Sequence, residues 1–337
     1  MLKHAATLIF LLVGFQITSS GQGTVPPIDS LALVDLYNST GGPSWTNNSN
    51  WLTGTLTTWF GITMTGRKVK SISLPFNNLS GVLPSSLGSL NEMDTFDLSS
   101  NNLSGEIPLT FVDLTALQRM DLSGNALSGP VSSLPPLLLD LKLNNNRFTD
   151  MSVITPLLSV ADVSFNELVT LGDLTGNNLT TLKVENNNLT FEDLEPNVSI
   201  PVFTYSPQDS VESKQNKLVE PGTSETLAST TAGSANVYQW FRNNLPIAGE
   251  VSSSLILSDI TVSDDAVYHF EVTNTIVTGL TLFRRPVQLK VSSLRRDSIS
   301  LQLFHEKTNG PGWINDSNWL TTPLSSGNWQ GVTITDN

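Results

Sequence analysis

Six asparagines of this chain recur in a single frame, and that frame constrains the fold more than any other feature of the sequence. Each is followed two residues later by an apolar residue and preceded by apolar residues three, five and eight positions earlier; they are Asn77, Asn101, Asn125, Asn146, Asn166 and Asn187. The apolar residues three and five positions back alternate as they would on one face of a short strand. The asparagine predicts a turn, because its side-chain amide can satisfy backbone groups of its own turn and of the neighbouring one.

The pattern L-x-x-L-x-L-x-x-N-x-L, repeated every 20 to 24 residues, resembles the leucine-rich repeat signature. The resemblance implies a solenoid of short parallel strands with an irregular or 3-10 helical convex side, in which each repeat buries its apolar face against the next. We expect this solenoid over residues 69–208, with six repeats and a degenerate closing strand. In the closing strand Gln208 stands where the frame expects asparagine.

Residues 24–68 precede the first repeat and are expected to form a cap over its exposed end, with a short helix followed by a turn rich in tryptophan. The residues that indicate this are Leu31, Leu33, Leu36 and Tyr37, then Trp45, Trp51 and Trp59. The segment DSLALVDLYNSTGGPSWTNNSNWL resembles the plant-type amino-terminal cap of leucine-rich-repeat receptor ectodomains, and LSGVLP and LSGEIP resemble the S-G-x-I-P element of plant-type repeats. Plant caps of this kind carry a cysteine pair. This chain has no cysteine, which favours a bacterial surface protein built on the same cap.

Residues 1–22 have the layout of a secretory signal peptide, with Lys3, an apolar stretch from Ala5 to Phe15, and small or polar residues after it. That stretch is too short to span a bilayer, and no later stretch approaches the required length, so the sequence predicts no transmembrane segment. We therefore expect a protein that is secreted or held at the cell surface. A formal charge of −13 argues against nucleic acid and anionic lipid surfaces as partners.

After the closing strand the asparagine frame stops, and short alternating strands predict a second domain over residues 209–293. The strands are expected at residues 225–229, 237–242, 254–257, 267–272 and 282–291. The sequence around them resembles an immunoglobulin-like β-sandwich, which implies that Trp240 is its buried tryptophan and Tyr268 its tyrosine corner. Phe270, packed against Leu227 or Ala228, then takes the place of the inter-sheet disulfide. Strand alternation predicts that His269 faces solvent. With a solenoid of short strands and a β-sandwich, we expect the chain as a whole to be mainly β.

Residues 297–337 repeat the cap. The stretch from Asp297 to Leu320 matches the stretch from Asp29 to Leu52, with Trp313 and Trp319 in step with two tryptophans of the first cap. We expect a second, truncated repeat cap. We expect the chain to be a fragment, or a truncated gene product, of a longer protein in which solenoid and sandwich alternate.

No set of residues has catalytic or metal-binding spacing, so we expect no enzymatic activity, no metal and no cofactor. The chain has three histidines, no two of them spaced to share a metal, and lacks a G-x-S-x-G elbow, a P-loop and a dinucleotide-binding turn. Asp97 and Asp121, on adjacent strands, are candidates for a cation site or an acid/base pair. The sequence L-D-L-S is common in repeats of this type, however, which favours a structural role for both. A structural role is likewise favoured over calcium binding for Asp264 and Asp265. The tryptophans of the cap are expected in its core rather than on a sugar-binding platform.

The concave face of the solenoid is the expected binding surface, because it is large, rigid and exposed to solvent. By spacing, the residues that line it are Lys70, Ser71, Ser73, Phe76, Asp94, Thr95, Asp97, Gln118, Arg119, Asp121, Asp140, Lys142, Asn145, Ser159, Val160, Asp162, Phe165, Thr181, Lys183 and Glu185. Among them the candidate contacts are Phe76, Asp97, Arg119, Asp121, Lys142, Asp162, Phe165 and Lys183. Mixed charge without a deep pocket suits a protein or glycan partner.

Three functional interpretations remain open. The favoured one is a non-catalytic binding or adhesion module that recognises a protein or glycan on the concave face. One alternative is the ectodomain of a receptor of receptor-kinase type, which the cap implies. The other is the accessory arm of a larger extracellular enzyme, and sequence beyond Asn337 would separate the three.

Overall fold

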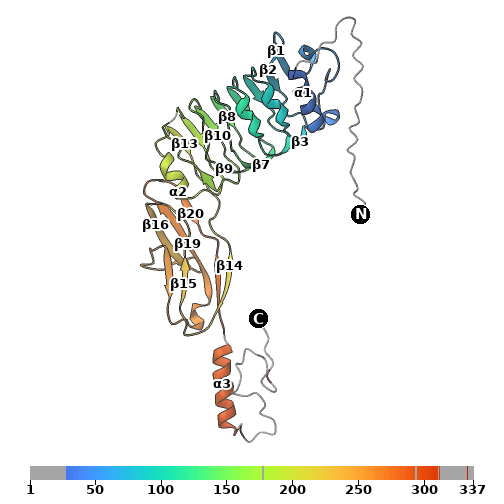
Figure 1. Ribbon diagram of the computed structural model, residues 1–337. Helices are drawn as coiled ribbons and strands as arrows, with labels where there is room; N and C mark the ends of the chain where they lie inside the picture. The colour runs from blue at the N-terminus through green and yellow to red at the C-terminus, as the bar shows by residue number, and fades with distance from the viewer. Residues whose placement is uncertain (1–27, 177, 293, 310, 312–331, 333–337) are drawn as a thin grey trace, which may run out of the picture.

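The computed structural model of the chain describes residues 28–176, 178–292, 294–309, 311 and 332. Figure 1 shows a solenoid, then a sandwich of strands, then a helix, in chain order. The described structure is mainly β, and its first part is a leucine-rich-repeat solenoid, as the sequence predicts. The predicted signal peptide and most of the predicted second cap lie outside the described residues.

One sheet runs the length of the solenoid and takes one short strand from each repeat. In spatial order its strands are β1 (Ile62–Thr65), β2 (Lys68–Ser73), β4 (Thr95–Asp97), β6 (Arg119–Asp121), β8 (Asp140–Lys142), β10 (Val160–Asp162), β12 (Thr181–Lys183) and β13 (Val202–Thr204). Neighbours are parallel except for β1, which pairs antiparallel with β2 at one end. The apolar frame residues, such as Ile72 and Leu74, are fully buried. The residues between them therefore face outward together.

A second parallel sheet flanks the first, where the sequence predicts only irregular or 3-10 helical structure. Its strands, in sequence order, are β3 (Ser80–Val82), β5 (Asn102–Gly105), β7 (Ala126–Pro130), β9 (Arg147–Met151) and β11 (Thr170–Leu171). It forms because the apolar residue after each asparagine, such as Leu79 or Leu103, is buried and draws an extended segment against the next repeat. The 3-10 helices η3 (Ser85–Ser89) and η4 (Leu109–Asp113) follow β3 and β5, and residues 131–139 and 152–159 of later repeats are irregular, so the prediction is right for these segments and misses only the second sheet.

The frame asparagines tie each repeat to its neighbour through their side-chain amides. Oδ1 of Asn101 accepts the backbone N–H groups of Asn77 at 3.0 Å and Leu79 at 2.9 Å, both in the preceding repeat. Its Nδ2 donates to the carbonyl of Leu74 in that repeat and to the carbonyl of Leu98 in its own, each at 2.9 Å. At Asn125, Asn146, Asn166 and Asn187, Oδ1 accepts one backbone N–H of the preceding repeat, and Nδ2 donates to one carbonyl of that repeat and one of its own. We call this set of contacts the asparagine ladder.

The asparagine ladder continues into both ends of the solenoid. At the carboxyl end Gln208 replaces asparagine: its Nε2 donates to the carbonyl of Val184 at 2.9 Å, and its Oε1 accepts the N–H of Leu189 at 3.2 Å. At the amino end the side chain of Asn77 exchanges two hydrogen bonds with the backbone of Asn47 in the cap. The first repeat and the closing strand are therefore held by the same chemistry as the central repeats.

The helix α1 (Ile28–Ser39) covers the amino-terminal end of the solenoid. Leu33 is fully buried, whereas Leu31 is 51% exposed, contrary to a helix face that includes both. Two helical steps of 100° separate these side chains by about 200°, so they cannot face the same core. The buried carboxylate of Asp29 accepts the backbone N–H of Val69 at 2.9 Å, which joins the start of α1 to β2.

A core of tryptophans fills the turn that follows α1. This turn contains the 3-10 helices η1 (Gly42–Ser44) and η2 (Leu56–Thr58). Trp51 lies between Trp45 and Trp59, with ring centroids 4.8 Å from each, and all three are at most 6% exposed. Every indole N–H donates to a backbone carbonyl of the cap. These rings are core residues and present no platform to a sugar.

The sandwich contains a six-stranded sheet and a two-stranded sheet. The larger sheet has β14 (Gln215–Val219), β21 (Val287–Val291), β19 (Ala266–Asn274), β16 (Asn236–Arg242) and β17 (Leu245–Pro246) in spatial order, with β20 (Thr281–Phe283) also paired to β19. The smaller sheet pairs β15 (Glu225–Ala228) with β18 (Ser254–Leu257). The expected strand over residues 282–291 is therefore two strands, because the segment between them contains Pro286, which cannot donate to a sheet.

Aromatic rings fill the space between the two sheets. Phe270 and Trp240 are both 0% exposed, their ring centroids are 5.2 Å apart, and they meet edge to face. Leu227 is buried from the smaller sheet, whereas the alternative Ala228 is exposed. The hydroxyl of Tyr268 donates to the carbonyl of Asp264 at 3.0 Å, the hydrogen bond of a tyrosine corner.

His269 points away from the core, as strand alternation predicts, but it is less exposed to solvent than expected. Its ring stacks on Phe241 of the adjacent strand, with centroids 4.9 Å apart and planes 5° from parallel. The side chain is half-buried as a result. This burial lowers the pKa of His269, against a smaller opposite effect of the Glu271 charge.

Side chains from both domains hold the junction between solenoid and sandwich. The helix α2 (Phe191–Leu194) ends beside Glu195, whose carboxylate accepts hydrogen bonds from Ser234 Oγ at 2.6 Å and Asn274 Nδ2 at 2.7 Å. The hydroxyl of Tyr205 donates to the carbonyl of Thr278 at 2.5 Å. An ion pair between Arg284 and Glu212, 2.8 Å long and nearly buried, holds the segment that leads into β14 against the sandwich.

The helix α3 (Leu294–Lys307) follows the sandwich and includes the start of the predicted second cap. Among the described residues, no helix is long and apolar enough to cross a membrane. The remaining residues of that predicted cap lie almost entirely outside the described part of the chain.

Candidate binding face of the solenoid

Two rows of outward-facing side chains cross the eight-stranded sheet, and we call this exposed surface the sheet face. The first row is Ser73, Asp97, Asp121, Lys142, Asp162 and Lys183. The second row, two residues earlier on each strand, is Ser71, Thr95, Arg119, Asp140, Val160 and Thr181. The strands pair in register and lie about 4.8 Å apart, so each row brings its residues side by side. The sheet face is the surface that the sequence predicts to be concave.

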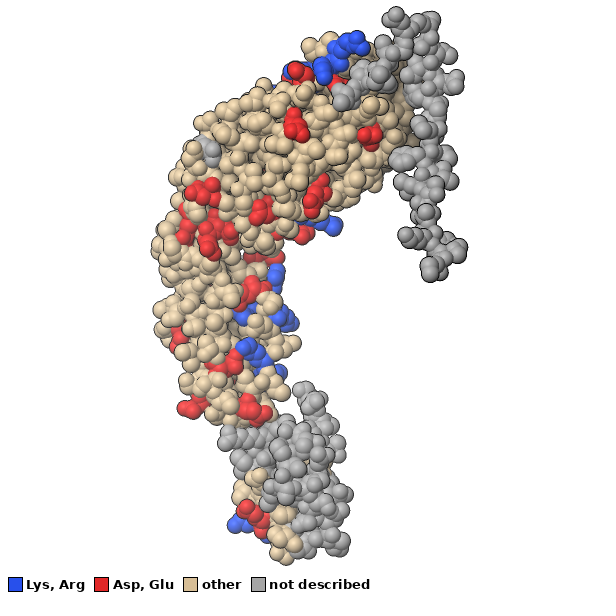
Figure 2. Space-filling model, viewed as in Figure 1, with Lys and Arg blue, Asp and Glu red and all other residues tan. Residues whose placement is uncertain are grey.

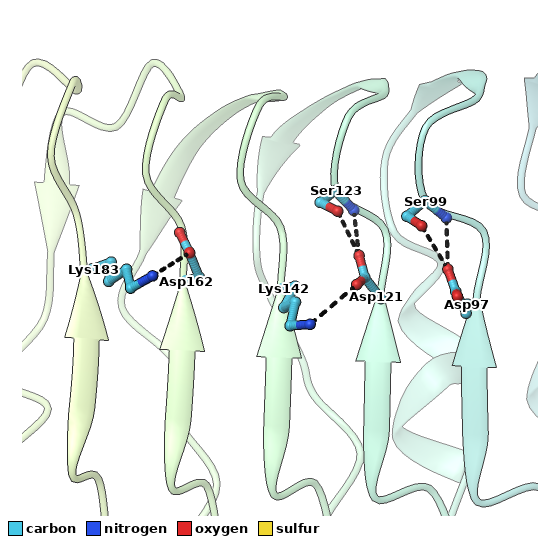
Figure 3. Close-up of polar contacts among 7 residues, drawn as sticks. All are labelled: Asp97, Ser99, Asp121, Ser123, Lys142, Asp162 and Lys183. Carbon is cyan, nitrogen blue, oxygen red and sulfur yellow. Dashed lines mark hydrogen bonds and ion pairs between the residues drawn. The ribbon is translucent and has the colours of Figure 1, made fainter. Parts of the chain in front are cut away.

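Charges in the first row neutralise one another in pairs. Nζ of Lys142 lies 3.6 Å from Oδ2 of Asp121, and Nζ of Lys183 lies 3.3 Å from Oδ2 of Asp162. Figure 3 shows that each pair links two adjacent strands. All four side chains are partly exposed, so each ion pair stabilises the fold by only about 0–1 kcal/mol. Their main effect is to fix where the charged groups lie on the sheet face.

The aspartates of the first row also hold the turns that follow them. Oδ1 of Asp97 accepts hydrogen bonds from the backbone N–H of Ser99 at 3.0 Å and from its hydroxyl at 2.7 Å (Figure 3). Asp121 and Asp162 bind Ser123 and Ser164 in the same way. Among the described residues, no group of His, Cys, Asp or Glu is arranged to hold a metal ion. A structural role for Asp97 and Asp121 accounts for their contacts better than a cation site.

A shallow hollow of about 180 Å³ opens in the sheet face across β4, β6 and β8. Its lining is Thr95, Phe96, Asp97, Arg119, Met120, Asp121, Asp140 and Lys142. Nη2 of Arg119 donates to Oγ1 of Thr95 at 2.9 Å, which draws the guanidinium toward β4. On the opposite side of the hollow, Oδ1 of Asp140 is buried and has no hydrogen-bond partner among the described residues.

The structure brings six of the eight candidate contact residues onto the strands of the sheet face. The other two, Phe76 and Phe165, lie in turns three residues beyond β2 and β10, with φ of 53° and 54°. They are 77% and 50% exposed and stand at the rim of the sheet face. Asp140 was expected to line the face but not selected as a contact. Its charge, opposite to that of Arg119 in register on the next strand, is the signal that would have selected it.

Charge elsewhere on the surface is mostly acidic. Figure 2 shows Asp and Glu side chains gathered over α2, where Glu192 and Asp193 occupy the first helical turn. Two larger hollows lie off the sheet face. One, of about 500 Å³, adjoins η3 and η4; the other, of about 430 Å³, adjoins Gln208 and is lined largely by asparagines, including those of the ladder. Neither combines unpaired side chains of both charges as the hollow around Asp140 does.

Comparison with known proteins supports the repeat assignment over part of the chain. Residues 67–127 match the leucine-rich repeat family. No curated protein sequence matches the chain. The solenoid assignment rests on this match together with the strand arrangement described above.

Solved structures of plant receptor ectodomains resemble the chain at a distance. The PEPR1–AtPEP1 structure is 26% identical with a TM-score of 0.46, and covers 54% of this chain and 29% of that one. Pollen receptor kinase 3 is 28% identical with a TM-score of 0.40, covering 47% of this chain and 83% of that one. The ectodomain of the Arabidopsis receptor kinase HAESA, in complex with an IDA peptide hormone, is 23% identical with a TM-score of 0.45, covering 57% and 34%. The match thus spans under a third of the length of the first of these structures.

Proposed function

We propose that this chain is a non-catalytic, extracellular recognition module that binds a polypeptide on the sheet face of its solenoid. The observation that carries the proposal is the pair of in-register rows, in which charged and polar side chains stand at fixed positions on a continuous sheet. The asparagine ladder holds the strands beneath them. A surface that is already ordered loses little conformational entropy when a partner binds.

The character of the sheet face favours a polypeptide over the other ligand classes. A hollow of about 180 Å³ is smaller than the roughly 300–1,000 Å³ of small-molecule sites. The exposed aromatics, Phe76 and Phe165, lie in turns that follow strands four steps apart, roughly 19 Å at strand spacing, so one sugar ring cannot stack on both. A partner that follows the rows can contact charged groups on five successive strands. An extended or folded polypeptide has the length and mixed polarity to do so.

Export is the second part of the proposal. Its support is the arrangement of residues 1–22, with a basic start, an apolar centre and a small, polar end. The absence of cysteine is compatible with export, since the asparagine ladder and the buried apolar core stabilise the solenoid without disulfides. We infer that the mature protein is secreted or attached to a cell surface.

We infer that the sandwich is immunoglobulin-like and serves as a spacer behind the solenoid. The support is the buried Trp240 against Phe270, and the hydrogen bond from Tyr268 to the carbonyl of Asp264. Its contacts with Glu195 and Tyr205 join it to the end of the solenoid. A receptor ectodomain remains the alternative, because the cap resembles that class; a membrane span and a kinase domain in the complete gene would favour it.

A displayed library of random polypeptides, panned against the immobilised chain, tests the proposal. The sheet face is altered by Arg119→Ser with Phe165→Asn; asparagine tolerates the left-handed backbone at position 165. The matched control changes exposed apolar residues off the sheet, Leu109→Asn with Val112→Asn on η4. The sheet-face variant should bind the selected polypeptides at least about tenfold more weakly, the effect of one hot spot, and the control should bind them like the parent.

Two results would contradict the proposal. Failure to select any polypeptide, together with binding on a glycan array, would replace a protein partner by a carbohydrate. Equal loss of binding in the η4 control and the sheet-face variant would move recognition off the sheet face. Thermal unfolding of every variant separates loss of binding from loss of fold.

A further inference from the structure

We propose that the hollow around Asp140 is a subsite for one lysine or arginine side chain of the polypeptide ligand. The inference rests on the proposed function and adds the chemical identity of the residue that the sheet face selects. It is based on which charged side chains around the hollow have a partner and which do not.

Five charged side chains line the hollow, and they do not balance. Three are carboxylates, Asp97, Asp121 and Asp140, and two are cations, Arg119 and Lys142, which leaves a formal charge of −1. The pair between Asp121 and Lys142 is the only ion pair among these five. The hollow therefore presents unpaired charged groups of both signs with a net excess of carboxylate. That excess favours a cationic group of a partner.

Asp140 is the group whose contacts are incomplete. Its Oδ1 is buried and accepts no hydrogen bond from any described residue. The two cations that line the hollow, Arg119 on the flanking strand β6 and Lys142 on β8 itself, are directed elsewhere. Arg119 donates to Thr95 on β4, and Lys142 pairs with Asp121 on β6. A carboxylate with one oxygen buried and without a donor is unfavourable. Asp140 as a whole is only half-buried and lines the hollow, so a ligand ammonium or guanidinium can approach the carboxylate from the open side and offset its charge.

The surroundings of Asp140 also suit the aliphatic part of a basic side chain. Val160 lies beside Asp140 in register on β10 and is half-buried, so it offers an apolar surface to methylene groups. Across the hollow the guanidinium of Arg119 has five N–H donors and uses one of them in its hydrogen bond to Thr95. A backbone carbonyl of the ligand is the matching acceptor. The subsite thus takes a basic side chain at Asp140 and the adjoining peptide group near Arg119.

The test uses polypeptides selected on the parent chain from a displayed random library. We expect the selected sequences to share one lysine or arginine. Each shared basic residue is then replaced by norleucine or citrulline, which keep the shape and remove the charge. For the parent chain, the replacement should weaken binding by about tenfold or more, since it leaves the carboxylate of Asp140 without a cationic partner.

The same measurement is made on Asp140→Asn, which preserves the shape of the side chain, and on Asp113→Asn as the charge-matched control. Asp113 is exposed on η4, away from the sheet face. With Asp140→Asn the charged and uncharged peptides should bind equally, and with Asp113→Asn the parent's preference should persist. This double-mutant cycle isolates the contact between residue 140 and the peptide from any change in the fold. Melting temperatures confirm that both variants are folded.

Three outcomes overturn the subsite. The first is that the selected polypeptides share no basic residue, and the second is that Asp140→Asn still prefers the charged peptide. In both cases the proposed function still holds if binding depends on Arg119 and Phe165. If no polypeptide binds, the subsite and the proposed function fail together, and a glycan partner is the remaining explanation.

Discussion

Replacing Asn146 by alanine tests whether the asparagine ladder holds the repeats together. Oδ1 of Asn146 accepts the N–H of Leu127 at 3.0 Å, and its Nδ2 donates to the carbonyls of Leu122 and Leu143, each at 3.0 Å. The residue is only 8% exposed, so water replaces these contacts poorly. Three hydrogen bonds at a net 0.5–1.5 kcal/mol each predict a loss of about 1.5–4.5 kcal/mol. That is a large share of the roughly 5–15 kcal/mol of a typical domain.

The assay is urea unfolding of the whole chain, followed by far-ultraviolet circular dichroism, with Asn144→Ala as the matched control. Asn144 lies two residues earlier in the same turn, and its side chain makes no hydrogen bond to any described residue. The control should stay within about 0.5 kcal/mol of the parent, as surface substitutions do. Equal losses in the free energy of unfolding for the two variants would refute the reasoning. The loss would then come from any substitution in this turn and not from the hydrogen bonds of the asparagine ladder.

Three further predictions concern the sandwich, the junction and the cap. Phe270→Ala should destabilise the sandwich by about 3–5 kcal/mol, as truncation of a buried aromatic does, and Tyr268→Phe by only about 0.5–1.5 kcal/mol, the value of one hydrogen bond. Hydrogen exchange of the backbone amides in β16 and β19 measures both losses. Amide protection equal to that of the parent in Phe270→Ala would place the Phe270 ring outside the core. Burial raises the pKa of Glu195, but hydrogen bonds from Ser234, Asn274 and Ala235 outweigh it and lower the pKa below 4.5. The junction is therefore fully stabilised above pH 4.5 and loosens as pH falls through the lowered pKa, which small-angle scattering should detect in the parent but not in Glu195→Gln. Deleting residues 24–67 should uncover Val69 and cause aggregation or loss of cooperative unfolding, and an unchanged melting curve would show that they are no cap.

The repeat frame predicts the solenoid because its information is local. An asparagine three residues after a buried leucine decides where the strand ends and where the amide points, as the contacts of Asn101 show. Strand positions and the first row of the sheet face follow from that spacing alone. Gln208 shows that the side-chain amide matters more than the residue type, since the amide of this glutamine also bonds one backbone N–H and one backbone carbonyl.

Features that depend on partners distant in sequence were harder to foresee. The second sheet requires segments such as β3 and β5 to pair in register, at Ser80 with Asn102; the frame places a buried leucine beside each segment but does not specify that the backbones pair. His269 alternates away from the core, yet it is half-buried because Phe241 on β16 happens to stack on it. The spacing predicts that Asp140 lines the sheet face, but its buried Oδ1 without a donor and the hydrogen bond of Arg119 to Thr95 depend on side-chain positions that the spacing does not specify. Leu31 was misplaced for a simpler reason, because two helical steps carry a side chain to the opposite face.

Side-chain footprinting with hydroxyl radicals tests the central claim, that recognition takes place on the sheet face, most directly. The chain is oxidised alone and in the presence of a polypeptide selected on it, and the labelled residues are read by mass spectrometry. Phe76 and Phe165 at the rim of the sheet face are 77% and 50% exposed in the free chain, and Leu109 and Val112 on η4 are 67% and 47% exposed. Binding should protect at least one of the two phenylalanines and leave the η4 residues unchanged. Protection of Leu109 and Val112, with Phe76 and Phe165 oxidised as in the free chain, would contradict the account.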